Sequence, residues 1–247
     1  MSFSAILHFL VAVSEAPTRE ILTKELETAL GAYGFQYYCF LQQPKPVDNA
    51  SALIVAANWT SSWVERYSEK KYIISDPTIR YLLRTNRSFA WKEAVEAYAG
   101  NPHYNRMKKM MADGKNNGLA AGYVFPVFGR TGLMGATTIG GPDEIDLSPT
   151  EMALFEAAFR AAYFRYGDLM GLDLVGQTRE GIDVSLTHRE IQALSYLAEG
   201  MTSQEIGQAL DVSPNTVDWY VGSLQAKLNA RNRNQAVAFG LRMGLIS

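Results

Sequence analysis

The sequence is poor in the residues on which most covalent and metal-dependent chemistry relies. Its 247 residues include one cysteine and three histidines, so no internal disulfide can form. His8, His103 and His188 have no motif partner, and neither a metal-ligand spacing nor a glycine-rich phosphate loop is present. Cys39 lies in an apolar stretch and is expected in the core. These absences argue against an enzyme and predict neither a metal nor a cofactor.

Strong charge and long apolar runs are also missing. The formal net charge of -2 gives no sign of a nucleic-acid or membrane partner. No apolar run approaches the roughly 18 residues that span a bilayer. The apolar start, MSFSAILHFLVAVSEA, has no Lys or Arg before it, so we expect a buried helix rather than a secretory signal. With a single cysteine, these features favour a cytoplasmic protein.

What the chain does contain is core material, divided between two predicted domains. Hydrophobic residues make up 47% and charged residues 19%, as in ordinary globular proteins. Residues 171–185, GLDLVGQTREGIDVS, carry three glycines and no sustained apolar period, which is typical of a linker. We therefore predict one domain over residues 1–170 and a second over 186–247.

The first domain is predicted to be α+β, an α/β/α sandwich with a mostly antiparallel sheet. Two hairpins are expected, since joined strands of this kind argue against a doubly wound parallel fold. The strands are 35–42 with 51–58, and a second pair within 122–141 that turns at Gly129 to Gly132. Helices are expected at 19–33, 61–70, 104–118 and 148–169. The last of these could pack on the sheet or form a dimer contact.

The second domain is predicted to be all helical, with helices at 188–199, 203–210, 214–228 and 233–242. Thr187 with Glu190 and Thr202 with Glu205 form capping boxes, and Ser213-Pro214 starts the third helix. Only a short turn separates the second helix from the third. Two helices joined in this way form a helix-turn-helix.

The stretch LTHREIQALSYLAEGMTSQEIGQALDVSPNTVDWYVGSLQAKLNARNRNQAV resembles the LuxR-type DNA-binding domain. Glu190, Leu194 and Gly200 stand at the signature spacing of that family, and Thr216-Val217 and Lys227-Leu228 also match. The resemblance covers the last 62 residues. It implies a third helix that enters the major groove.

In that third helix, Val217, Val221, Leu224 and Leu228 share one face and should pack inward. From residue 186 onward, five acidic residues balance five basic ones, so placement rather than bulk charge must bring the chain to phosphates. Lys227, Arg231 and Arg233 are the phosphate candidates. The full predicted DNA-binding set is Thr202, Ser203, Asn215, Thr216, Asp218, Trp219, Gly222, Lys227, Arg231 and Arg233.

Two of these positions depart from the family, which often has basic residues at 218 and 222. Asp218 could accept from a cytosine amino group, or it could simply offset the dipole at the helix start. Trp219 could contact a thymine methyl group. The preferred operator should therefore differ from that of a relative with two basic residues.

The first domain resembles the autoinducer-binding domain that precedes some LuxR-type DNA-binding domains. Trp63 and Tyr67 are four apart, Asp76-Pro77 follows nine residues after Tyr67, and Trp91 follows fourteen after Pro77. Pro126, Gly132 and Thr138 continue in steps of six. The resemblance covers roughly residues 20–165 and implies an N-acyl-homoserine lactone as ligand. The clustered acids of a receiver domain are not found.

The resemblance assigns roles that suit the chemistry of such a ligand. Trp63 would donate to the ring carbonyl and Asp76 would accept from the amide N–H, because a buried polar group without a partner costs about 1–3 kcal/mol. Thr138 would donate to the acyl side, and Thr78 supplies a second hydroxyl. Trp91 would lie against the lactone ring and Tyr67 over the tail.

Trp59 is the departure. The family commonly has a tyrosine four residues before Trp63, whose hydroxyl bonds the amide carbonyl, and this chain has Trp59. The indole N–H could replace that hydroxyl, or the larger ring could reshape the pocket.

Together these features predict a ligand-responsive transcription factor of quorum sensing. It would bind a two-fold DNA operator as a homodimer, with RNA polymerase as a further candidate partner. The alternative is an orphan regulator of the same fold that binds DNA without lactone or responds to another small molecule.

Overall fold

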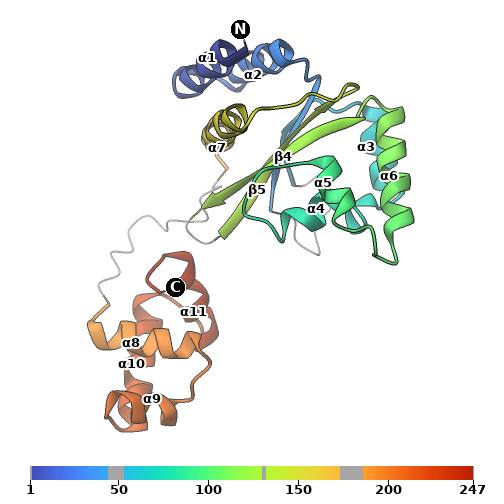
Figure 1. Ribbon diagram of the computed structural model, residues 1–247. Coiled ribbons are helices and arrows are strands. Elements are labelled where there is room, and N and C mark those ends of the chain that lie inside the picture. Colours follow the sequence, from blue (N-terminus) through green and yellow to red (C-terminus); the bar gives the residue numbers. More distant parts are fainter. Residues whose placement is uncertain (1, 44–52, 130–131, 173–185, 247) are drawn as a thin grey trace. The chain divides into compact units, whose positions relative to one another are not determined.

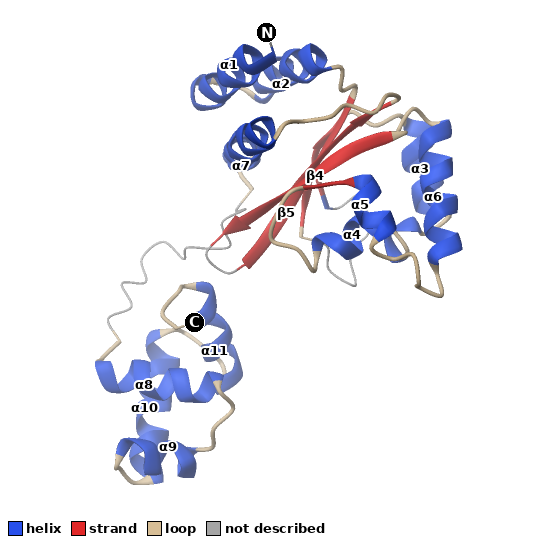
Figure 2. Cartoon of the chain, viewed as in Figure 1, coloured by secondary structure: helices blue, strands red, loops and turns tan. Residues whose placement is uncertain are grey.

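The computed structural model describes residues 2–43, 53–129, 132–172 and 186–246. These residues form two compact units, and the break between them falls between Leu172 and Leu186. The predicted linker lies almost wholly outside the described residues, so its bounds stay a prediction. Figures 1 and 2 show the first unit as a sheet with helices on both faces and the second as a group of helices.

The first unit is built on a five-stranded sheet in the order β2-β1-β5-β4-β3. The pairs β1–β2, β1–β5 and β3–β4 are antiparallel, which confirms the predicted α+β class. Residues 44–52 and 130–131, in the two predicted hairpin connections, lie outside the described residues. The strands are β1 (Tyr37–Gln42), β2 (Ile54–Ala57), β3 (Phe89–Ala90), β4 (Ala121–Gly129) and β5 (Gly132–Gly141).

The sheet separates two apolar cores because side chains alternate between its faces. On β1, Tyr38 and Phe40 belong to one core, whereas Cys39 and Leu41 belong to the other. The first core lies under three helices: α1 (Ser2–Glu15), α2 (Arg19–Tyr33) and α7 (Pro149–Leu169). Cys39 is buried, as expected.

Helix α7 begins at the predicted capping box of Ser148 and Glu151, with Pro149 in its first turn. Its buried face includes Phe155, Phe159 and Tyr163, which belong to the first core. Packing on the sheet therefore accounts for this face of the helix. That was one of the two alternatives from the sequence, and the other was a dimer contact.

The second core lies between the opposite face of the sheet and a set of shorter helices (Figure 1). These are α3 (Ser61–Glu69), the 3₁₀ turn η2 (Tyr72–Ile74), α4 (Pro77–Leu82), α5 (Trp91–Glu96) and α6 (Tyr104–Asn116). The sequence did not predict η2, α4, β3 or α5 as separate elements. Each is six residues or shorter, too short for an apolar period to develop.

The second unit consists of α8 (His188–Ala198), α9 (Ser203–Leu210), α10 (Pro214–Lys227) and α11 (Arg233–Arg242), within one residue of the predicted bounds. The side chains of Thr187 and Thr202 cap α8 and α9 in the two predicted capping boxes. Ser213 caps α10, and Pro214 occupies its first turn. In neither unit is any described helix long and apolar enough to cross a bilayer.

Candidate ligand pocket and DNA-binding surface

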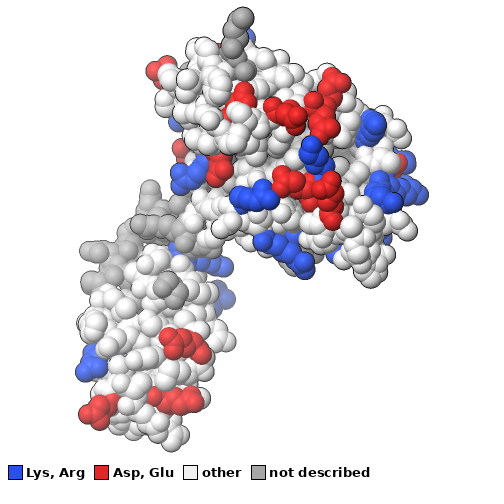
Figure 3. All heavy atoms as spheres, viewed as in Figure 1, with Lys and Arg blue, Asp and Glu red and all other residues white. Residues whose placement is uncertain are grey.

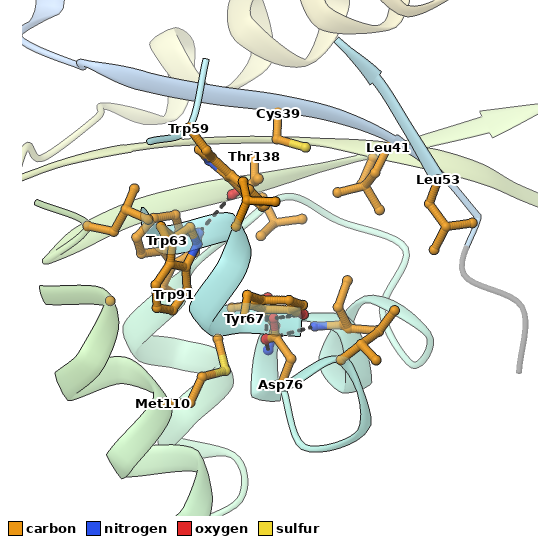
Figure 4. A pocket seen from close by; sticks show the side chains of 18 of the residues that line it. Cys39, Leu41, Leu53, Trp59, Trp63, Tyr67, Asp76, Trp91, Met110 and Thr138 are labelled. Atoms are coloured by element: carbon orange, nitrogen blue, oxygen red, sulfur yellow. Dashed lines mark hydrogen bonds between the residues drawn. The ribbon is translucent and has the colours of Figure 1, made fainter. Parts of the chain in front are cut away.

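A cavity of about 100 Å³ lies in the second core, between the sheet and helices α3 to α6. That is room for several water-sized groups, so a small molecule fits there better than a single water. Figure 4 shows polar side chains from the helices and the sheet around one space. The structure brings all seven predicted ligand residues into the lining: Trp59, Trp63, Tyr67, Asp76, Thr78, Trp91 and Thr138.

Asp76 is 5% exposed and serves two purposes at once. Its Oδ1 caps helix α4, accepting from the backbone N–H of Thr78 at 2.8 Å and of Ile79 at 3.4 Å. Oδ1 also accepts from the Thr78 hydroxyl at 2.7 Å, and Oδ2 accepts from the Tyr67 hydroxyl at 2.8 Å. From the described part of the chain, Oδ2 accepts this one bond only, and a carboxylate oxygen can accept more than one, so Oδ2 keeps capacity for a ligand N–H.

Burial acts on both partners of the Tyr67–Asp76 pair. Removal from water raises the pKa of Asp76, while the bonds from Thr78 and Tyr67 partly counter that rise. Burial, and then the nearby charge of Asp76, raises the pKa of Tyr67 well above its usual value. The Tyr67 hydroxyl therefore stays protonated and acts as a donor to the carboxylate.

Trp91 and Thr138 form a second polar pair in the lining of the pocket (Figure 4). The indole N–H of Trp91 donates to the Thr138 hydroxyl at 3.0 Å, and that hydroxyl donates to the carbonyl of Tyr123 at 3.1 Å. The single hydroxyl proton of Thr138 is thus already used. Donation from Thr138 to a ligand stays a prediction, and it requires that proton to turn away from Tyr123.

Two glycines on neighbouring strands explain where the Trp91 ring lies. A Cβ on Gly122 of β4 would lie 2.7 Å from the Trp91 ring, and one on Gly140 of β5 would lie 2.3 Å from it. Real Cβ contacts are never this close, so the indole packs directly on bare backbone. Neither glycine is among the residues predicted to contact the ligand.

The aromatic residues around α3 differ in their positions. Trp63 is buried and lies edge-on to Tyr67, with ring centroids 5.7 Å apart. Trp59 is half-buried, and its ring centroid lies 6.5 Å from that of Tyr67. It precedes the helix, because Thr60 is the N-cap of α3. Among the described residues, neither Trp59 nor Trp63 uses its indole N–H in a hydrogen bond, so both can donate to a ligand.

Most of the remaining lining is apolar and was not predicted. It comes from alternate strand positions and from inward faces of helices, which the sequence shows only as general core. Cys39 is among these residues, and burial raises the pKa of its thiol, so it is not a reactive thiolate. The other unpredicted apolar members include Leu41, Leu53, Ile54, Ile79, Leu82, Met110, Met111, Leu119, Val124 and Ala136.

In the second unit, α10 has the two predicted faces. Val217, Val221 and Leu224 are buried, as is Leu228 just after the helix. On the outer face, Trp219 is 66% exposed, which is unusual for so large an apolar side chain. On the view in Figure 3, basic and acidic residues are interspersed rather than gathered into one basic patch.

Asp218 on α10 is held by its neighbours. Its Oδ1 accepts from the Ser203 hydroxyl of α9 at 2.7 Å and lies 4.0 Å from the guanidinium of Arg233 on α11. All three side chains were predicted to contact DNA. The structure brings them together at the start of α9, α10 and α11. Asp218 thus has partners in both neighbouring helices. The sequence predicted either a base contact or an interaction with the helix dipole, and it did not predict these partners.

Lys227, predicted to contact phosphate, pairs with a buried carboxylate. Its Nζ lies 2.8 Å from Glu190 Oε2, and Glu190 is only 2% exposed. Glu190 also accepts from the Ser223 hydroxyl at 2.6 Å and from the Thr187 N–H at 2.6 Å. These partners overcome the effect of burial and lower the pKa of Glu190 to about 2. This ion pair ties α8 to α10, and a phosphate contact by Lys227 stays a prediction.

Comparison with known proteins identifies both domains. Residues 18–165 match the family model of the autoinducer binding domain, and residues 184–239 match that of bacterial regulatory proteins of the luxR family. Together they span well over half of the chain. The described residues contain no group of three side chains able to hold a metal.

Curated relatives match along almost their whole length. The transcriptional activator protein BjaR1 of Bradyrhizobium diazoefficiens is 26% identical, over 90% of this chain and 88% of that protein. The quorum sensing-dependent transcriptional regulator RpaR of Rhodopseudomonas palustris is 28% identical, over 94% and 90%. These relatives are transcriptional regulators, in agreement with the prediction that the chain is not an enzyme.

The fold also has a solved counterpart. The crystal structure of SdiA from Escherichia coli matches with a TM-score of 0.60 at 21% identity, covering 98% of each chain. Taken with the two family matches, the fold and the relatives lead to one conclusion. The chain belongs to the LuxR family of bacterial regulatory proteins, as a quorum-sensing transcription regulator with an autoinducer-binding domain followed by a helix-turn-helix DNA-binding domain.

Proposed function

We propose that this regulator binds an N-acyl-homoserine lactone in the pocket of its first unit and a two-fold DNA operator as a homodimer. The observation that carries the proposal is the division of the pocket into a polar part and an apolar part. Asp76 has spare acceptor capacity on Oδ2, and Trp63 and Trp59 have indole N–H groups without partners among the described residues. The rest of the lining is mainly aliphatic.

This division suits the ligand group by group. The amide N–H of a lactone meets a buried carboxylate, its carbonyl oxygens meet indole donors, and its acyl tail meets Leu, Ile and Met side chains. Each polar group that would otherwise be buried without a partner then has one, which avoids a cost of about 1–3 kcal/mol per group. A ligand with only an apolar chain would leave the indole N–H groups of Trp59 and Trp63 without an acceptor.

A titration with a panel of lactones of different tail lengths tests the ligand. A lactone at a hundred times its Kd should stabilise the protein by about 2.7 kcal/mol and raise its Tm. The ring-opened acyl-homoserine of the same tail length is the matched control, because it retains the amide and the tail but carries a charged carboxylate in place of the ring. No shift across the panel would refute lactone binding, and equal shifts for both compounds would show that the pocket does not recognise the lactone ring.

A second experiment tests the homodimer. Binding to a palindromic operator should show two copies of the chain per duplex, whereas an isolated half-site should bind far more weakly. Light scattering of the complexes measures the stoichiometry. One copy per full operator would contradict the proposed dimer.

One observation favours the alternative of a regulator that works without lactone. Within the protein itself, Asp76 is already bonded to Tyr67 and Thr78, and Thr138 to Trp91 and Tyr123. These side chains therefore do not need a ligand in order to be satisfied. Operator binding of equal strength with and without lactone would favour this second function.

A further inference from the structure

Three polar contacts join α3 and its C-cap to α6 and its C-cap. The donors and acceptors advance in steps of four along α3 while they run backward along α6, as expected for antiparallel helices. We call this set the α3–α6 ladder. Its contacts are Ser62 Oγ to Asn117 Oδ1 at 3.1 Å, Arg66 Nε to Asp113 Oδ2 at 2.8 Å, and Arg106 Nη2 to the Lys70 carbonyl at 3.1 Å.

Asp113 makes the central contact and differs from the other members because it is buried, with 9% exposure. The same Oδ2 atom accepts from Arg66 and from the hydroxyl of Tyr72. The bond from Arg66, and then that from Tyr72, lowers the pKa of Asp113. The side chain is therefore a carboxylate at neutral pH, and its two donors are held close together.

Tyr72 connects this carboxylate to the pocket. Its ring stacks on Trp63, with centroids 6.2 Å apart and an interplanar angle of 28°, and meets Tyr67 edge-on at 6.0 Å. Neither Asp113, Arg66 nor Tyr72 lines the cavity. Asp113 therefore does not face the cavity, and these aromatic rings connect it to the lining.

The ladder also determines the rotation of α3. Trp63 and Tyr67 each follow a ladder residue by one position, which is about 100° around a helix. Ser62 and Arg66 contact α6, and the residue that follows each of them lines the cavity. These two lining residues are Trp63 and Tyr67. Turning the helix would move both rings together.

We propose that Asp113 is a positioning residue for ligand recognition. By holding Arg66 and Tyr72 on one oxygen, it sets where Trp63 meets the polar end of the ligand and where Tyr67 meets its tail. This inference rests on the proposed function, since it takes the lactone to meet these two side chains. Loss of the carboxylate should therefore change which ligands bind, beyond any change in stability.

The test compares Asp113→Asn and Tyr72→Phe with two controls. Arg106→Ala breaks an outer contact of the same ladder, and Phe155→Leu weakens the core on the opposite face of the sheet. For each variant, Kd is measured for the preferred lactone and its neighbours in tail length, and Tm is measured without ligand. Asp113→Asn and Tyr72→Phe should weaken binding at least tenfold and alter the ratio between lactones. Arg106→Ala and Phe155→Leu should leave Kd within twofold.

Equal losses of affinity in Asp113→Asn and Phe155→Leu at comparable Tm would overturn the proposal and leave Asp113 a structural residue. Tyr72→Phe keeps the ring and loses only a hydroxyl, so it serves if Asp113→Asn does not fold.

If the wild type binds no lactone, the proposed function fails, and a ligand-free measurement of fluorescence still tests the role of Asp113. The difference in fluorescence between wild type and Trp63→Phe isolates Trp63. Asp113→Asn should shift that emission, and an unchanged emission would refute the positioning role.

Discussion

The Tyr67 hydroxyl donates a 2.8 Å hydrogen bond to Oδ2 of Asp76, so two titratable groups that are removed from water in the pocket satisfy each other. Burial alone would favour the protonated acid, and it does raise the pKa of Asp76. The bond from Tyr67 acts in the opposite direction and helps to keep the acceptor that a ligand amide needs. Ligand affinity should therefore depend on pH through this pair.

Tyr67→Phe should weaken lactone binding most strongly at acidic pH. Without the hydroxyl, the pKa of Asp76 rises further, so the carboxylate is lost at a higher pH as the solution is acidified. Affinity falls as pH drops through that pKa, and its midpoint should lie higher in the variant than in the wild type. Calorimetric Kd values between pH 4.5 and 7.5 measure the shift.

Tyr104→Phe is the matched control, because it removes a hydroxyl from a tyrosine outside the cavity lining. It should leave the pH profile of the wild type unchanged. The same midpoint in Tyr67→Phe and the wild type would show that Asp76 does not accept from the ligand as an ionised group.

Trp59→Tyr should change the preferred tail length or the preferred substituent at the acyl 3-position. Tyrosine is smaller than the indole and returns a hydroxyl to the place where the family commonly has one. Affinities for lactones of several tail lengths measure the preference. Trp59→Phe is the control, since it reduces the ring without adding a hydroxyl, and it separates the effect of size from that of hydrogen bonding. An unchanged preference in both variants would mean that Trp59 only fills the core.

The two roles of Asp76 could both be predicted from the sequence. An Asp-Pro pair taken alone is typical of a helix start, whereas the resemblance to the autoinducer-binding domain implies a ligand contact for Asp76. The structure has Asp76 capping α4 and lining the cavity at once. Because one carboxylate has several acceptor positions, the two interpretations were never exclusive.

The hydrogen bonds inside the site could not be predicted in the same way. The resemblance presents Thr78 and Thr138 as donors to a ligand, yet their hydroxyls are used by Asp76 and Tyr123. These pairings depend on strand register, such as Cys39 opposite Thr138, and on the rotation of short helices. Local sequence patterns carry little information on either. The pairing of Lys227 with Glu190 could not be predicted either, because the two residues are far apart in the chain.

Gly140→Ala should destabilise the first unit and weaken ligand binding together. The new Cβ would lie 2.3 Å from the Trp91 ring and 2.8 Å from the Ala121 carbonyl, so the indole must move toward the cavity. Overpacking of this kind costs about 1–3 kcal/mol. Gly31→Ala is the control, because a Cβ there meets nothing within 4 Å and α2 should gain slightly in stability. Chemical denaturation and lactone Kd measure both effects, and unchanged binding in Gly140→Ala would show that Trp91 does not limit the pocket.

Glu190→Gln should destabilise the second unit at neutral pH, by about 1–3 kcal/mol, because Lys227 and two further donors lose a charged acceptor. The pKa of Glu190 is lowered to about 2 in the folded protein, so its contribution is fully present above about pH 4.5 and is lost as pH falls toward 2. The difference in stability between wild type and variant should therefore shrink over that range. Denaturation followed by circular dichroism at several pH values measures it.

Glu205→Gln changes an exposed carboxylate in the capping box of α9 and serves as the control. A smaller loss of stability is expected, because glutamine can also close a capping box. A difference between wild type and Glu190→Gln that stays constant down to pH 2 would contradict the assignment of acid sensitivity to Glu190.

Trp219→Ala should relax operator selection without affecting the fold. The side chain is two-thirds exposed, so its removal should change stability by no more than about 0.5 kcal/mol.

If the indole contacts a thymine methyl group, the sites that the variant selects from a random duplex library should lose a thymine preference in each half-site. Replacing that thymine by uracil should weaken binding to the wild type about fourfold per half-site, since a buried methyl is worth about 0.8 kcal/mol. Arg231→Ala, a predicted phosphate contact, should instead weaken all sequences alike and lower the salt dependence. Equal binding of the thymine and uracil operators by the wild type would show that Trp219 has another partner.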